Sequence, residues 1–226
     1  MTGGRVGLVA TSALLFAAPA AAQQVHATMP ARIDAAKSYL IYSHGRIVEG
    51  TNPRPVREGW GVYDFPAIQQ ALVSGTDWEL ISKQRPLDAD LDLSADEIVG
   101  WVRALITAGV PSQRITLIGF SKGGGITALA SSRLRDLHLN TVLLATCWES
   151  MVADTAIRFG GQLLSIYETS DVGVGSCRVL VSRSPELAGF EELAISTGKE
   201  HGAFFRPLPE WVEPLKAWVR KRVSSP

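Results

Sequence analysis

The sequence predicts an α/β fold, a three-layer sandwich in which a mostly parallel sheet lies between two layers of helices. Short apolar stretches alternate along the chain with stretches whose apolar residues recur at helical spacing. Most of the expected strands are apolar at nearly every position, which indicates that helices cover both faces of the sheet. No repeat, low-complexity tract or linker interrupts this pattern, so we expect one domain.

The composition is that of an ordinary globular protein. The chain has 226 residues, of which 46% are hydrophobic and 19% are charged, enough for one substantial core. The 22 basic and 22 acidic side chains give a formal net charge of zero, and no basic run stands out. Nucleic acid is therefore not an expected partner.

Residues 1–22 predict a secretory signal peptide. Arg5 precedes an almost wholly apolar run at 6–18, and three alanines ending at Ala22 offer the small residues of a cleavage site. The apolar run is shorter than the roughly 20 residues of a membrane span. A membrane anchor and a buried first strand are the alternatives. We expect cleavage after Ala22, which leaves a domain at 23–226 that is periplasmic or secreted.

The first half of the mature chain predicts two strands and two helices after an irregular lead-in. The loop after the first strand is the longest and is a candidate for a partial lid. In order, we expect a strand at 38–43, the loop at 44–63, a helix capped by Asp64 with Pro66 in its first turn and Gly75 past its end, a strand at 78–82, and a helix with a capping box at 94–97 that stops at Gly109 and Pro111.

The second half continues the alternation. About 15 residues separate two of its strands, so no large cap domain fits between them. In order, we expect strands at 114–118, 140–145, 162–167 and within 191–196, a short helix around 151–159, and a C-terminal helix with Trp211, Leu215, Trp218 and Val219 on one face.

The segment Gly119-Phe120-Ser121-Lys122-Gly123 joins an apolar strand to a helix. A Gly-x-Ser-x-Gly sequence in this context is typical of a nucleophile elbow. Gly119 and Gly123 let the strand and the helix approach closely, and the tight turn lifts the Ser121 hydroxyl clear of the backbone. The alternatives are a plain turn and a phosphate loop, whose Gly-x-x-x-x-Gly-Lys-Ser/Thr pattern is not met.

At these residues the chain resembles the α/β-hydrolase family, and the resemblance extends over nearly all of the chain after the N-terminal segment. It implies a small hydrolase without a large cap, and the family's first antiparallel hairpin is expected to be missing or much reduced. It also implies that the base follows the last strand and that the acid follows the strand ending at Tyr167.

These positions nominate Ser121, Asp171 and His201 as a catalytic triad in the Ser…Asp…His order of the family. Among the four histidines, His201 has the place of the base; a solvated loop histidine is the alternative. Glu168 is the second candidate for the acid, and either carboxylate could be a solvent-facing turn residue.

Two backbone N–H groups are expected to bind the oxyanion. One belongs to Lys122, directly after the nucleophile, and the other to Gly45 or Arg46, with Arg46 preferred. His44 and Gly45 look like the family's His-Gly signature, although the longer His-Gly-Gly-Gly form is absent. We expect a structural hydrogen bond from the His44 side chain and a solvated Lys122 side chain.

Cys147 and Cys177 follow two consecutive expected strands, and neither has the spacing of a metal ligand. In an oxidising compartment these cysteines can form a disulfide, with two unpaired thiols as the alternative.

The sequence therefore predicts an exported serine hydrolase that cleaves an ester or a related acyl bond of a small molecule through an acyl-enzyme. No metal or organic cofactor is implied. A non-catalytic binding protein of the same fold, a peptidase and a thioesterase are the alternatives. Arg46, Arg54 and Arg57 in the long loop hint at an anionic group on the substrate, with merely solvated side chains as the alternative.

Overall fold

The computed structural model describes residue 1 and residues 24–223. The expected cleavage site at Ala22, and the signal segment apart from Met1, lie outside the described residues. The described chain forms a seven-stranded sheet in the order β1-β5-β2-β6-β7-β8-β9, in which all neighbouring strands are parallel. The strands are β1 (Val25–His26), β2 (Tyr39–Ser43), β5 (Glu79–Ile81), β6 (Ile115–Phe120), β7 (Asn140–Leu144), β8 (Gly161–Glu168) and β9 (Leu187–Ile195).

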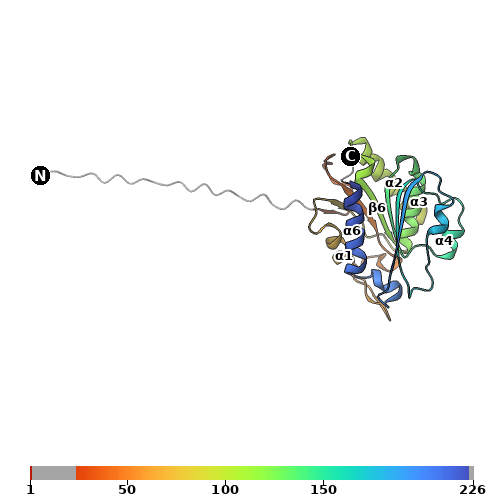
Figure 1. The fold of residues 1–226 in the computed structure, drawn as a ribbon. Helices are drawn as coiled ribbons and strands as arrows, with labels where there is room; N and C mark the ends of the chain where they lie inside the picture. Colours follow the sequence, from red (N-terminus) through yellow and green to blue (C-terminus); the bar gives the residue numbers. More distant parts are fainter. Residues whose placement is uncertain (2–23, 224–226) are drawn as a thin grey trace.

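Helices cover both faces of this sheet (Figure 1). Apolar residues of α1 and α6 share one core cluster, and those of α2 and α3 share another on the opposite face. The helices are α1 (Phe65–Val73), α2 (Leu91–Thr107), α3 (Lys122–Arg133), α4 (Glu149–Ala153), α5 (Arg178–Val181) and α6 (Pro209–Val223), with 3-10 turns η1 (Arg46–Val48), η2 (Ser112–Arg114), η3 (Arg135–Leu137) and η4 (Glu200–Phe204).

The alternation of side chains along β2 shows why the expected strands lack polar positions. Leu40 and Tyr42 belong to the cluster beneath α1 and α6, whereas Tyr39 and Ile41 belong to the cluster beneath α2 and α3. Successive residues of a strand point to opposite faces, so a strand covered on both faces buries all of them. The predicted three-layer sandwich is therefore confirmed.

The described residues also agree with the expectation that the family's first antiparallel hairpin is missing or much reduced and that no large cap domain is inserted. No antiparallel strand joins the large sheet, and the connection between β7 and β8 contains one short helix, α4, and no cap domain. The loop after β2 folds instead into a small antiparallel hairpin, β3 (Val56–Arg57) and β4 (Gly61–Val62).

Several local expectations differ from the structure. The lead-in contains a short strand, β1, because Val25 and His26 pair with β5. The last strand is longer than expected, and α4 is shorter. The capping box at 94–97 is wrong: α2 begins at Leu91, and the Asp90 side chain accepts a hydrogen bond from Leu93 N at 2.9 Å. In contrast, Asp64 caps α1 as predicted, accepting from Ala67 N at 3.1 Å.

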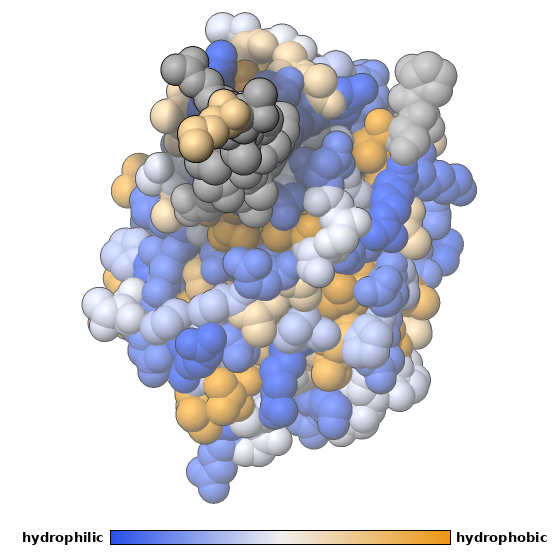
Figure 2. Space-filling view, turned by 90° about the vertical axis from the view of Figure 1, so that its left-hand side faces the viewer, coloured by the Kyte–Doolittle hydropathy of each residue, from blue (hydrophilic) through white to orange (hydrophobic). Residues whose placement is uncertain are grey.

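The surface in Figure 2 is mostly hydrophilic, and its apolar residues lie in small separate groups. Within residues 24–223, no helix combines the length and the apolar character that crossing a membrane requires.

The junction between β6 and α3 leaves no room for two side chains. A Cβ atom on Gly119 would lie 2.3 Å from the Gly123 carbonyl oxygen, and a Cβ on Gly123 would lie 2.0 Å from the Ser43 carbonyl oxygen. The helix therefore packs directly against the end of β2, the strand beside β6.

We expect Gly123→Ala to lower the free energy of unfolding by about 3 kcal/mol, since the clash is with backbone that cannot move aside. Gly100→Ala is the matched control, because Gly100 is exposed on α2 and its added Cβ meets nothing within 4 Å. That change should raise stability by about 0.5–1 kcal/mol. Equal effects of the two substitutions in urea unfolding would contradict the close approach.

Candidate active site

Ser121 occupies a strained turn at the carboxyl end of β6. Its φ is 53° and its ψ is −125°, a conformation that residues with a Cβ rarely adopt. Backbone hydrogen bonds at 3.1 Å hold it on both sides, from Ser121 N to Leu144 O and from Gly125 N to Ser121 O. Although Ser121 is the N-cap residue of α3, its side chain makes no capping hydrogen bond. The hydroxyl is therefore not engaged by the helix.

His201 and Asp171 form a close pair between two loops at the same edge of the sheet. His201 Nδ1 lies 2.6 Å from Asp171 Oδ2, and the two side chains are 15% and 11% exposed. Because an ionised carboxylate only accepts hydrogen bonds, this contact places the proton on Nδ1. Nε2 is then the nitrogen free to accept a proton.

Ser121 and His201 line one cavity of about 120 Å³. The rings of Phe120 and Trp60 lie 4.8 Å and 5.4 Å from the His201 ring and limit where it can turn. The lining residues are Gly45, Arg46, Ile47, Arg57, Trp60, Phe120, Ser121, His201 and Phe205. A second, wider cavity of about 580 Å³ also includes Ser121 in its lining, together with Arg46, Asp88, Ala89, Asp90, Leu91, Lys122 and Trp148.

Glu168, the second candidate for the acid, is buried and holds the two loops together. It accepts hydrogen bonds from Thr197 N at 2.8 Å, from Thr197 Oγ1 at 2.7 Å and from Ser170 Oγ at 3.1 Å. Ser170 Oγ also accepts from Glu200 N at 3.0 Å. Burial raises the pKa of Glu168, but the hydrogen bonds from Thr197 and Ser170 outweigh it and lower the pKa overall. Through these hydrogen bonds Glu168 connects the Asp171 turn with the His201 loop.

His44 is fully buried and has the structural role expected from the sequence. The Arg85 N–H donates to His44 Nε2 at 2.9 Å, so the proton lies on Nδ1, which donates to Gly45 O at 2.8 Å. Burial, together with the nearby Arg85 charge, lowers the pKa of His44 to about 3. The neutral side chain therefore connects the loop after β2 to the chain after β5 through hydrogen bonds.

A buried cluster of charges supports the same loop. The Arg85 guanidinium donates to Ser43 Oγ at 2.7 Å and to the His44 carbonyl oxygen, and its Nε lies 3.4 Å from Glu49 Oε1. The same Glu49 oxygen lies 2.7 Å from Lys122 Nζ. The Lys122 side chain is only 15% exposed, so the expectation of a solvated side chain is wrong.

The backbone at two helix starts offers hydrogen-bond donors beside Ser121. Lys122 is the first residue of α3 and Arg46 is the first residue of η1. The first N–H groups of a helix have no acceptor within it. Gly45 packs against the Phe120 ring, where an added Cβ would approach to 2.9 Å, which fixes the path of the loop.

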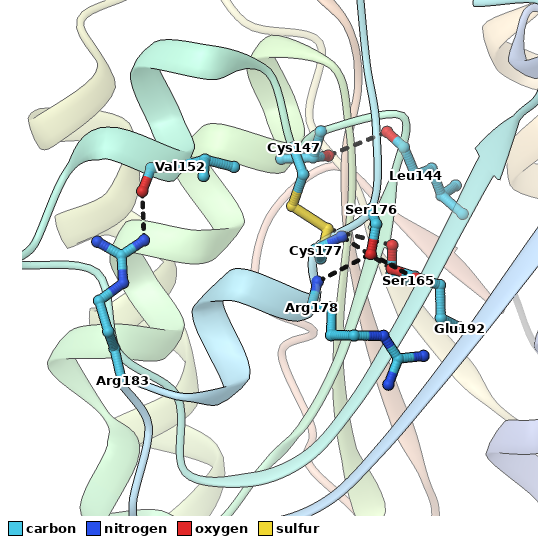
Figure 3. The surroundings of a disulfide bond; sticks show 10 residues. Leu144, Cys147, Val152, Ser165, Ser176, Cys177, Arg178, Arg183 and Glu192 are labelled. Carbon is cyan, nitrogen blue, oxygen red and sulfur yellow. Dashed lines mark hydrogen bonds between the residues drawn. A yellow bond between two sulfur atoms is a disulfide. The ribbon is translucent and has the colours of Figure 1, made fainter.

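Cys147 and Cys177 are joined by a disulfide with a Cα–Cα distance of 5.3 Å (Figure 3). The Cys147 carbonyl accepts from Gly175 N at 3.2 Å, and the Cys177 N–H donates to Glu192 Oε1 at 2.8 Å. The bond therefore fixes the far end of the loop that carries Asp171.

The other sequence candidates lie outside this arrangement or at its rim. His26 pairs with Glu79 at 2.8 Å, and His138 ends η3 with a left-handed backbone. The side chain of Arg54 pairs with Asp64, the cap of α1, at 3.0 Å.

Sequence reasoning missed Arg85, Glu49 and Trp60. The Arg85 side chain reaches residues 36 to 42 positions away, and Trp60 Nε1 donates to Glu200 Oε2, 140 positions away, at 3.0 Å. These contacts join residues that are far apart in the chain, so no spacing pattern in the sequence indicates them. They become visible only when the fold shows that charged side chains are buried beneath the loop that begins at His44.

Comparison with solved structures identifies the fold. A double mutant of the esterase E40 superposes with a TM-score of 0.58 and 16% identity, over 83% of this chain and 77% of that chain. A hormone-sensitive lipase from a metagenome library gives 0.60 and 15%, over 85% and 78%. SOBER1 of Arabidopsis thaliana gives 0.54 and 12%, over 83% and 100%. No protein-family model matches the chain, and no curated protein matches its sequence. The chain has the α/β-hydrolase fold.

We expect Arg85→Met to lower the free energy of unfolding by about 3 kcal/mol, because it removes one partner from a buried charge cluster. Urea unfolding measures the change. Arg54→Met removes an exposed pair in the loop after β2, which the buried cluster supports, and should cost less than about 1 kcal/mol. Similar losses for the two variants would show that the buried cluster does not stabilise the loop.

Proposed function

We propose that the protein is a serine hydrolase that cleaves an ester bond of a small molecule. The observation that carries this proposal is the His201–Asp171 pair beside the strained Ser121, at the carboxyl edge of a parallel sheet. The esterases and lipases among the solved structures of similar fold support the same class of reaction.

In this proposal Ser121 attacks the carbonyl carbon of the ester while His201 Nε2 takes the hydroxyl proton. Asp171 keeps the proton of the neutral imidazole on Nδ1 and stabilises the imidazolium that forms. The imidazolium then returns a proton to the leaving alcohol. Water, activated by the same histidine, attacks the acyl-enzyme and releases the acid.

The negative charge that develops on the carbonyl oxygen needs donors that are already in place. We assign these to the N–H groups of Lys122 and Arg46, the first residues of α3 and η1. The buried cluster of Arg85, Glu49 and the Lys122 side chain connects these two backbone segments and holds them in position.

The proposal includes export. Structural disulfides persist mainly in oxidising compartments, so the Cys147–Cys177 bond is consistent with the signal peptide expected at 1–22. Mass spectrometry of exported protein should give an N-terminus at Gln23; an intact Met1 in a membrane fraction would favour an anchor instead.

We expect Ser121→Ala to abolish both ester turnover and labelling by a fluorophosphonate probe, because the attacking oxygen is removed. A panel of acyl esters of graded chain length measures turnover, and circular dichroism checks that the variant folds. Ser182→Ala is the matched control, since the Ser182 hydroxyl lies outside the site and donates to Val179 O. Undiminished turnover by Ser121→Ala would show that this residue is not the nucleophile.

Asp171→Asn should lower kcat by about 10⁴-fold, because an amide does not hold the required imidazole tautomer.

Glu168→Gln should act mainly on stability, since Glu168 contacts Thr197 and Ser170 and its lowered pKa contributes stability when it is ionised. The contribution is present above its unfolded pKa near 4.5 and is lost as the pH falls through the folded value. The stability difference between Glu168→Gln and wild type should therefore shrink in acid. A larger loss of kcat in Glu168→Gln would make Glu168 the acid.

A further inference from the structure

The smaller cavity beside Ser121 and His201 is lined by two arginines and by no acidic residue. The arginines are Arg46 and Arg57. Arg46 Nη2 already lies 3.2 Å from Asp88 Oδ1. Within residues 24–223, the Arg57 guanidinium has no such pair, although Glu58 and Glu200 lie on nearby segments. Of the two arginines that line this cavity, Arg57 is therefore the one whose guanidinium is not held in an ion pair in the described part of the chain.

Trp60 positions the Arg57 guanidinium at the site. The guanidinium carbon lies 4.3 Å from the centroid of the Trp60 ring, and Trp60 contacts the His201 ring. Trp60 cannot shift toward the His201 loop, because even a Cβ on Gly202 would lie 2.7 Å from Trp60 Cβ. Stacking uses the face of a guanidinium and leaves its N–H donors, which lie in the plane, free for a carboxylate.

The position of His201 identifies which part of the substrate enters this cavity. The imidazolium gives its proton to the leaving oxygen, so the leaving group must lie on the His201 side of Ser121. The wider cavity, which His201 does not line, is then left for the acyl group.

We infer that the substrate is an ester whose leaving alcohol carries a carboxylate and that Arg57 binds this carboxylate. The inference rests on the proposed ester hydrolysis. The cavity has a volume of about 120 Å³. An enclosed cavity of about 150 Å³ holds benzene, so a short hydroxy acid fits in this one.

The test compares acetoxyacetate with acetoxyacetamide, two acetate esters of similar shape that differ in the charge of the leaving group. We expect kcat/KM to favour acetoxyacetate, and Arg57→Gln to lower this ratio roughly tenfold by removing a charge-assisted pair at an exposed position. Arg57→Lys should retain part of the ratio, because it keeps the charge and loses the planar fork. Added salt should lower the wild-type ratio.

Arg54→Gln is the matched control, because Arg54 belongs to the same loop, pairs with Asp64 and does not line the cavity. It should leave the ratio unchanged. A ratio that Arg57→Gln does not alter overturns the inference. So does a carboxylate preference found only on the acyl side, measured with monoethyl succinate against ethyl succinamate.

Binding to the Ser121→Ala variant separates this inference from the proposed reaction. NMR titration should show tighter binding of acetoxyacetate than of acetoxyacetamide, and adding Arg57→Gln should remove the difference. If the wild type hydrolyses no ester, the proposed reaction fails while this binding difference still supports the carboxylate site. Equal binding of the two esters overturns the carboxylate site whether or not the protein is an esterase.

Discussion

The contact on which the site depends is the approach of α3 to the end of β2, where Gly123 meets the Ser43 carbonyl. It fixes the turn that carries Ser121 relative to the loop that begins at His44. The two segments that offer free backbone donors, at Lys122 and Arg46, therefore keep a constant separation. Any side chain at residue 123 would increase that separation before it changed the chemistry of the serine itself.

Two buried polar networks hold the loops on either side of this contact. Arg85 and Glu49 support the loop after β2, and Glu168 connects the loops after β8 and β9. Both networks place buried charged side chains at the base of loops. Such networks are costly to leave incomplete, so they favour one loop conformation over its alternatives. In the proposed enzyme they serve to keep the reacting groups in position before substrate binds.

The sequence predicted those parts of the molecule that local order determines. Consecutive apolar residues define β2 and β6 to within a residue or two, and the turn at Ser121 follows from glycines four positions apart. The start of α2 was missed because Asp90 and Ser94 both belong to its first turn, and the capping-box pattern favoured the later residue. Two residues competing for one cap cannot be separated by spacing alone.

The placement of the site residues could be predicted only from the general rule that the carboxyl ends of parallel strands meet at one edge of the sheet. That rule brings the loops carrying Ser121, Asp171 and His201 together. It does not say which of Asp171 and Glu168, three residues apart in one turn, contacts His201. In the structure Asp171 makes that contact, and Glu168 accepts hydrogen bonds from Thr197 and Ser170. Nor does it give the side-chain partners of Lys122, because Glu49 reaches it from another loop.

The disulfide has a consequence for the order in which the chain folds. It joins residues 30 positions apart and encloses β8, which must pair with both β7 and β9. Parallel pairing is slow because the chain must first close a long loop against its own entropy. A chain oxidised before folding has closed this loop, which stabilises it by about 3–4 kcal/mol through the unfolded state. Folding and oxidation are therefore coupled, and a chain that is oxidised early begins the pairing of β7, β8 and β9 from a smaller set of conformations.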